Sequence, residues 1–221
     1  MKNRAMWLIA VVVLLFGLSP AKAVILSDNL SQPQSQFSPE PLTGDGWAAT
    51  SFGTGTQSWL LQSVTLLMSA ESLGDTAQVD IYTAVLAPTT DTPPFPPTQP
   101  GSLYATLTSP VIGTTLGQYT FTPSGSLLLD ANSTYWVVLQ ALSGQVIWAY
   151  PDLGSSGSGI GFQNYWRTSD DGGASWNFAN NDTGAFMMRV DAIPEPSTLM
   201  LFGTTALLLG LGYRRQAGNS A

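Results

Sequence analysis

The amino-acid sequence predicts an all-β protein, an antiparallel β-sandwich of jelly-roll type that lies between two targeting segments. Between residues 24 and 192, short stretches with an apolar residue at every second position recur between Gly, Pro, Asn and Asp turns. No stretch in this range keeps the 3.6-residue period of an amphipathic helix. Each end of the chain instead carries an apolar run next to basic residues, which is typical of segments that meet a membrane.

Residues 1–23 have the three parts of a secretory signal peptide. A short basic region and an apolar run lead to a small-residue cleavage site at Ala21 and Ala23. We expect cleavage after Ala23, and an uncut N-terminal anchor is the alternative. The exported domain would then cover residues 24–192, about 170 residues, which is enough for one domain with its own core.

About ten short strands are expected in this domain. In chain order they are residues 47–52, 59–68, 77–85, 103–107, 118–122, 126–129, 134–142, 145–150, 160–167 and 185–191. The strand at 134–142 is apolar on both faces and should lie at the centre of a sheet, paired with 145–150 across a Ser-Gly turn. Alternation within 77–85 places Asp80 on the solvent side. Six prolines between residues 88 and 100 predict a solvated, polyproline-like loop.

Composition excludes several classes of function. The chain has no Cys and no His, which excludes disulfides, thiol nucleophiles, catalytic imidazoles and the usual zinc or copper sites, and we expect no cofactor. Between residues 24 and 193 only Arg167 and Arg189 oppose thirteen acids, a net charge of −11. Because phosphate binding needs clustered cations, this charge excludes nucleic-acid partners.

The C-terminal tail has the composition of a membrane-retention segment. It contains Pro194, Glu195 and Pro196, then an apolar run over residues 198–213, then Arg214 and Arg215. A helix of that length spans about 24 Å, less than the ~30 Å of a bilayer core, so the span is marginal. Arginines after the run should stay in the cytoplasm and leave the domain outside. A buried C-terminal core helix is the alternative.

This tail resembles the PEP-CTERM sorting signal of Gram-negative bacteria that make exopolysaccharide, here assigned to residues 193–216. The resemblance implies that an exosortase, a membrane-embedded enzyme with a catalytic cysteine, is a partner that processes the chain near the motif. It also implies export across the inner membrane, transient anchoring there, and release to the cell surface or the extracellular space.

The domain resembles a second family, the choice-of-anchor R domains. The matching segments are residues 63–67, 100–107, 119–123, 132–139 and 169–176. This resemblance implies an exported, anchored β-domain with no established biochemical activity.

Residues 169–176 also fit the Asp-box pattern Ser-x-Asp-x-Gly-x-Ser-Trp, a hairpin turn that is structural even where it recurs in sialidases. A sialic-acid site would need clustered arginines, which the domain lacks. Asp170 and Asp171, with Asp182 nearby, could instead form an oxygen cage for calcium, although their spacing matches no EF-hand. Solvated turn acids are the simpler interpretation, so no metal is expected.

Four tryptophans, Trp136, Trp148, Trp166 and Trp176, together with Tyr150, are candidates for stacking against sugar rings, and burial in the core is the competing interpretation. The function we expect is a non-enzymatic, exported surface or matrix protein, associated with exopolysaccharide in an adhesive or structural role. The alternatives are a glycan-binding module and a glycoside hydrolase with two paired carboxylates. The aspartates considered for such a pair are Asp75, Asp80, Asp130, Asp152, Asp170 and Asp171.

Overall fold

The computed structural model describes residues 22–34, 41–88, 98–152, 156–178 and 184–195. Residues Ala23–Pro194 form one β-domain by their contacts. Most of the signal peptide and the expected membrane segment at 198–213 lie outside the described residues. Within the described residues, no helix is long and apolar enough to cross a membrane.

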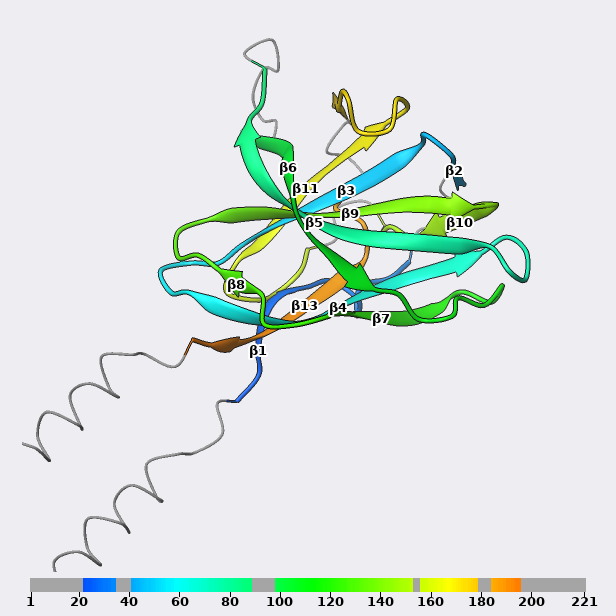
Figure 1. Ribbon diagram of the computed structural model, residues 1–221. Coiled ribbons are helices and arrows are strands. Elements are labelled where there is room, and N and C mark those ends of the chain that lie inside the picture. The colour runs from blue at the N-terminus through cyan, green and yellow to red at the C-terminus, as the bar shows by residue number, and fades with distance from the viewer. Residues whose placement is uncertain (1–21, 35–40, 89–97, 153–155, 179–183, 196–221) are drawn as a thin grey trace, which may run out of the picture. The chain divides into compact units, whose positions relative to one another are not determined.

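The described chain consists of strands joined by turns, so the all-β prediction is confirmed (Figure 1). The strands are β1 (Val24–Asp28), β2 (Leu42–Thr43), β3 (Trp47–Gly53), β4 (Trp59–Ala70), β5 (Thr76–Leu86), β6 (Thr98–Thr108), β7 (Gly117–Pro123), β8 (Leu128–Leu129), β9 (Thr134–Ser143), β10 (Gln145–Trp148), β11 (Phe162–Ser169), β12 (Asn177–Phe178) and β13 (Met188–Pro194).

All strand pairs are antiparallel, and the main path runs β1-β13-β4-β7-β6-β5-β9-β3-β11-β12. The short strand β10 pairs with β4 and β2, and β8 pairs with β4. In Figure 1, β5, β9 and β3 form one half of the domain and β13, β4 and β7 form the other. The predicted jelly-roll sandwich is not confirmed, because the pairing continues from one half into the other through β6 and β7.

The sheet is nearly closed into a barrel, because β1, the first strand of this path, also contacts the segment just before β11, near the other end. Ser158 bridges Asp28 of β1, and the Gly161 amide donates to the Leu26 carbonyl at 2.8 Å. The Gly53 amide, at the end of β3, donates to the Gly161 carbonyl at 2.7 Å. A Cβ at Gly161 would collide with the Gly53 carbonyl, so this backbone contact requires glycine.

Strand β9 lies between β5 and β3, as predicted, and is apolar on both faces. Val137 and Leu139 face the main core, whereas Trp136 and Val138 belong to a smaller apolar cluster with Ala49 of β3. All five side chains have 0% exposure. Both faces of this part of the sheet are therefore covered.

Two predictions about neighbouring strands are wrong. The segment after the Ser-Gly turn does not pair with β9, because β10 crosses to the other half of the barrel and pairs with β4, with Trp148 opposite Met68. Asp80 does not face solvent: it is 1% exposed, and its Oδ2 accepts hydrogen bonds from Gln78 and Gln140 at 2.8 and 2.9 Å. Its alternation is as predicted, but the outer face on which it lies is itself covered.

Candidate ligand-binding pocket

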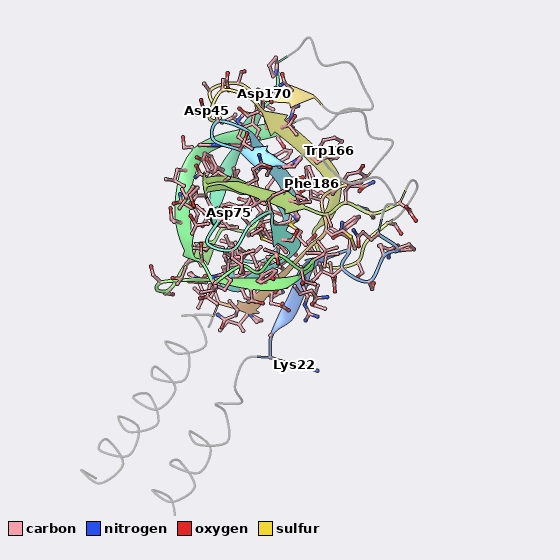
Figure 2. The ribbon with its side chains drawn as sticks, turned by 90° about the vertical axis from the view of Figure 1, so that its right-hand side faces the viewer. Lys22, Asp45, Asp75, Trp166, Asp170 and Phe186 are labelled. Atoms are coloured by element: carbon pink, nitrogen blue, oxygen red, sulfur yellow. The ribbon has the colours of Figure 1, made fainter. Side chains whose placement is uncertain are left out.

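A cavity of about 640 Å³ lies where the two halves of the barrel separate, between β11 on one side and β10 with β2 on the other. Its aromatic lining consists of Trp47, Trp148, Tyr150, Trp166 and Phe186. Its polar lining consists of Thr43, Asp45, Thr168, Ser169 and Asp170. Figure 2 shows Asp45 and Asp170 together at one end of the domain, with Trp166 and Phe186 deeper along the same side.

Phe186, in the segment before β13, is the centre of the aromatic lining. It stacks on Trp148 at a centroid distance of 4.9 Å, and Trp166 meets it edge-on at 5.3 Å. Tyr150 meets the same ring edge-on at 6.5 Å. Phe186 is 7% exposed and Trp148 is 1% exposed, whereas Tyr150 and Trp166 are half-buried. The first two rings therefore form a floor, and the accessible aromatic surface comes from the others.

Two side chains hold this floor in place. The Trp148 indole N–H donates to the Met187 carbonyl at 2.9 Å. The buried Asn29 amide donates to the carbonyls of Ala185 and Phe186 at 3.0 and 3.3 Å, and its Oδ1 accepts from the Met188 amide at 2.7 Å. The Asn29 side chain thus supplies hydrogen-bond partners for backbone groups of the segment just before β13.

Trp166 contributes a buried polar atom that the protein does not satisfy. Its indole N–H has no hydrogen-bond partner, although Trp166 lines the pocket. A buried donor without an acceptor costs about 1–3 kcal/mol. The Trp136 indole N–H in the smaller cluster is unpaired as well, and both N–H groups are enclosed, so a ligand in the pocket would meet the half-buried ring of Trp166 rather than its N–H.

The Asp-box turn forms one wall of the pocket, and its hydrogen bonds are internal. The Asp171 carboxylate accepts from the Ser175 amide at 2.8 Å, the Ser175 hydroxyl at 2.6 Å and the Ser169 hydroxyl at 2.7 Å. These bonds, those from Ser175 first, lower the pKa of Asp171 to about 2. Because its oxygens are occupied by the turn, Asp171 has a structural role.

The same turn is joined to the start of β3. The Gly172 amide donates to the Asp45 carbonyl at 2.9 Å, and Trp176 packs against Trp47 with centroids 6.4 Å apart. Gly173 has φ +81°, and a Cβ there would lie 2.5 Å from the Trp47 ring. The turn therefore sets the position of Trp47, which lines the pocket.

The calcium cage considered as an alternative is not assembled by the described residues. Asp182 lies outside them, and among them no group of three or more His, Cys, Asp or Glu side chains could hold a metal ion. Asp170 and Asp171 use their carboxylates for separate hydrogen bonds. Asp170 Oδ2 accepts from the Asn177 side-chain amide at 2.9 Å, and Asp171 accepts from groups inside the turn.

The four candidate tryptophans have different environments. Trp136 is 0% exposed and packs in the smaller cluster outside the main core, so the prediction that it stacks on a sugar is wrong. Trp148 is buried in the floor, where a sugar could reach no more than a fraction of its surface. Trp176 packs on Trp47 and does not line the pocket. Trp166 does line it, half-buried.

Sequence reasoning missed Trp47, Phe186 and Asp45 as pocket residues, whereas Tyr150, which it had considered for sugar stacking, does line the pocket. Each of the three missed residues lies beside a turn signal rather than in a motif, so no local pattern marked it. Of the six aspartates considered for a hydrolase, Asp170 lines the pocket and the other five do not. Asp75, for example, caps the β4–β5 turn, where its carboxylate accepts from the amides of Ser72 and Gln145.

The chain leaves the domain through β13, which connects the pocket to the tail. This strand begins two residues after Phe186 and ends at Pro194, which is paired with Trp59. Its seven residues cover about 20 Å at ~3.3 Å per residue. The tail therefore begins well away from the pocket floor.

Residues 192–216 match the PEP-CTERM protein-sorting motif. The sorting motif marks the chain as an exosortase substrate, exported and held at a membrane by its C-terminal segment. The prediction made from Pro194, Glu195 and Pro196 is confirmed to this extent, and Arg214 and Arg215 fall within the matched residues. A comparison with curated proteins finds no match. The motif covers the tail alone, so the choice-of-anchor R resemblance of the domain is not shown.

Proposed function

We propose that the domain binds a neutral glycan in the pocket beside Trp166, and that the sorting motif delivers this binding module to the cell surface. The observation that carries the proposal is a cavity lined by the half-buried aromatic side chains of Trp47, Tyr150 and Trp166. The cavity volume of about 640 Å³ is within the range of small-molecule sites, ~300–1,000 Å³.

The lining suits a sugar. The half-buried faces of Trp47, Tyr150 and Trp166 offer flat apolar surface for the C–H side of a pyranose ring. Asp45 and Asp170 supply acceptors at the rim for sugar hydroxyls. A carboxylate accepts stronger hydrogen bonds than a neutral oxygen does.

Charge favours a neutral glycan over an acidic one. Recognition of a sugar carboxylate relies on Arg or Lys, and the pocket lining contains neither among the described residues. Arg167 lies on β11 but is 0% exposed, and its Nε donates to the Thr98 carbonyl at 3.2 Å. The net charge of −11 over residues 24–193 opposes an anionic polymer further.

The proposed biological role is that of a non-enzymatic component of the cell surface or the extracellular matrix, associated with exopolysaccharide. Its β-domain is proposed to be of the choice-of-anchor R type. The segment 198–213 would hold the protein in the inner membrane until the exosortase releases it. β13 supports display of the pocket, because it separates Phe186 from the tail by most of its length.

Binding is tested with the mature domain, first on a glycan array and then by calorimetry with the best neutral oligosaccharide. Trp166→Ala should weaken binding at least about tenfold, equal to about 1.4 kcal/mol. Trp166→Phe keeps a ring and removes the N–H, so it should lose a smaller part. Trp176→Phe is the matched control, since Trp176 lies outside the lining. Unchanged affinity in Trp166→Ala, or no binding to any neutral glycan, would contradict the proposal.

Sorting is tested separately in the host bacterium. Replacing Pro194, Glu195 and Pro196 with alanine should leave a larger, membrane-bound form, because proline keeps the preceding residues out of helix and alanine does not. Replacement of Arg214 and Arg215 should loosen the membrane orientation instead. Maturation of the triple-alanine variant to the wild-type size would show that the tripeptide is only a linker.

A hydrolase is the second candidate, because Asp45 and Asp170 both line the pocket. Glycosidases place two carboxyl groups about 5–9.5 Å apart across the bond they cleave. Incubation of the bound oligosaccharide with the domain distinguishes the two functions. Release of a shorter product, lost in Asp170→Asn, would favour the hydrolase, and an intact oligosaccharide would favour binding alone.

A further inference from the structure

The sheet of the domain continues into the sorting motif. The motif begins at residue 192, whereas β13 extends to Pro194. Ala192 is paired with Leu61, Ile193 with Leu60 and Pro194 with Trp59. Three residues of the matched motif are therefore part of the folded domain, and Glu195 is the first residue of the motif beyond the strand.

The last residue pairs of this ladder are well anchored on β4. Trp59 is 4% exposed, and its indole N–H donates to the Thr54 carbonyl at 2.7 Å. Leu61 and Ala192 are also buried, at 2% and 0%. These side chains belong to the main core, so the end of β13 cannot leave β4 without exposing core residues.

Strand β1 covers the other edge of β13 only as far as Ala192. Val24, the first residue of β1, is paired with Ala192, and β1 contributes no pair beyond it. β13 is thus an inner strand as far as Ala192 and an edge strand over Ile193 and Pro194. Pairing ends altogether at Glu195, which is exposed.

We propose that the fold itself limits where the sorting enzyme can cut: the Pro194–Glu195 bond is the first one open to it, and the mature protein keeps the whole of β13. A peptide bond enters a protease cleft as an extended segment whose own backbone groups are unpaired. Bonds before Pro194 meet this condition only when the strand opens, and cleavage of a protected segment follows the population of the open form.

The chemical step is a peptide hydrolysis. Water supplies a hydroxyl group to the carbonyl carbon of the residue before the cut and a proton to the nitrogen of the residue after it. The bond broken is either Pro194–Glu195 or one that follows it. The domain then ends in a new carboxylate at Pro194 or at a later residue, with the buried part of β13 intact.

The full chain is expressed in its host, which supplies the sorting enzyme, and the C-terminal residue of the mature protein is found by mass spectrometry. A chain that ends at Pro194 or later is expected. A chain that ends at Ile193 or earlier would overturn the proposal.

A loosened ladder tests whether pairing is the cause. Trp59→Ala removes the anchor opposite Pro194 without changing the motif, so we expect a mixture of C-terminal ends that now includes residues before Pro194. Trp59→Phe should keep the wild-type end. If Trp59→Ala does not fold, Leu60→Gly weakens the neighbouring pair instead. A folded variant with a loosened ladder and the wild-type end would show that motif recognition alone selects the bond, and would overturn the proposal.

Discussion

Asn29 allows the most direct test of how the pocket floor is held. Its side chain makes three buried hydrogen bonds to the backbone of the segment before β13, two as donor and one as acceptor. Asn29 itself is 2% exposed. In Asn29→Ala the Met188 amide and the carbonyls of Ala185 and Phe186 lose these partners inside the protein, where water does not replace them readily.

The magnitude follows from the three bonds. At a net ~1 kcal/mol each, Asn29→Ala should lower the free energy of unfolding by about 3 kcal/mol. For a domain of about 170 residues, this corresponds to a fall in Tm of about 6–12 °C. Urea denaturation followed by tryptophan fluorescence measures the change, and an unchanged m-value would show that unfolding remains cooperative.

Asn177→Ala is the matched control, because the Asn177 amide bonds the exposed Asp170 carboxylate at 2.9 Å. It should change stability by less than about 0.5 kcal/mol. The glycan affinity of Asn29→Ala should also fall, since Phe186 supports Trp166 and Tyr150. A loss of stability below about 1 kcal/mol in Asn29→Ala would refute the assigned role, because the loss of a single hydrogen bond would account for it.

Three further outcomes are expected from other parts of the domain. Gly161→Ala should destabilise the domain by more than about 3 kcal/mol, since its Cβ would collide with the Gly53 carbonyl. Gly125→Ala is the control, because a Cβ there would meet open space. Equal melting temperatures for the two variants would contradict the Gly161–Gly53 contact. The pKa of Asp171 is about 2 in the fold against 3.8 ordinarily, so its contribution to stability is complete above about pH 4 and is lost as the pH falls toward 2. Asp171→Asn should remove that part of the acid unfolding curve, and an identical curve would show that the turn does not depend on the charge. Arg189→Gln breaks a half-exposed ion pair with Asp191 and should change stability by no more than about 1 kcal/mol, measured in urea; a larger loss would mean that the pair is not screened by solvent.

Local patterns in the sequence were sufficient for the type of structure and for the tail. Alternation of apolar residues predicted the strands, since a β-strand places every second side chain on the same face. An apolar sequence on both faces placed β9 at the centre of its sheet, and the structure confirms this. The sorting motif is a contiguous segment, so Pro194, Glu195 and Pro196 identified it without any knowledge of the fold.

Which strands pair, and which of two apolar faces is accessible, depended on tertiary structure. The Ser-Gly turn after β9 predicted a hairpin, but β10 crosses to β4, where Trp148 reaches the core. Alternation also placed Asp80 correctly on the face of β5 opposite to Val79 and Ile81, but it could not show that this outer face is covered. Period-2 reasoning defines two faces and does not say what lies against each.

The pocket also shows the difference between what local sequence patterns predict and what tertiary contacts decide. Trp136 and Trp166 are both strand tryptophans in sequence, but one is enclosed and the other lines the cavity. The cavity joins the start of β3 to the end of β10, the end of β11 and the segment before β13, and of these four segments β3 is the one far away along the chain. The sequence by itself determined the strands, the charge and the sorting motif, because each depends on neighbouring residues. Only the tertiary structure decided which aromatic rings meet, because Trp148, Trp166 and Phe186 belong to separate segments whose contacts no local pattern shows.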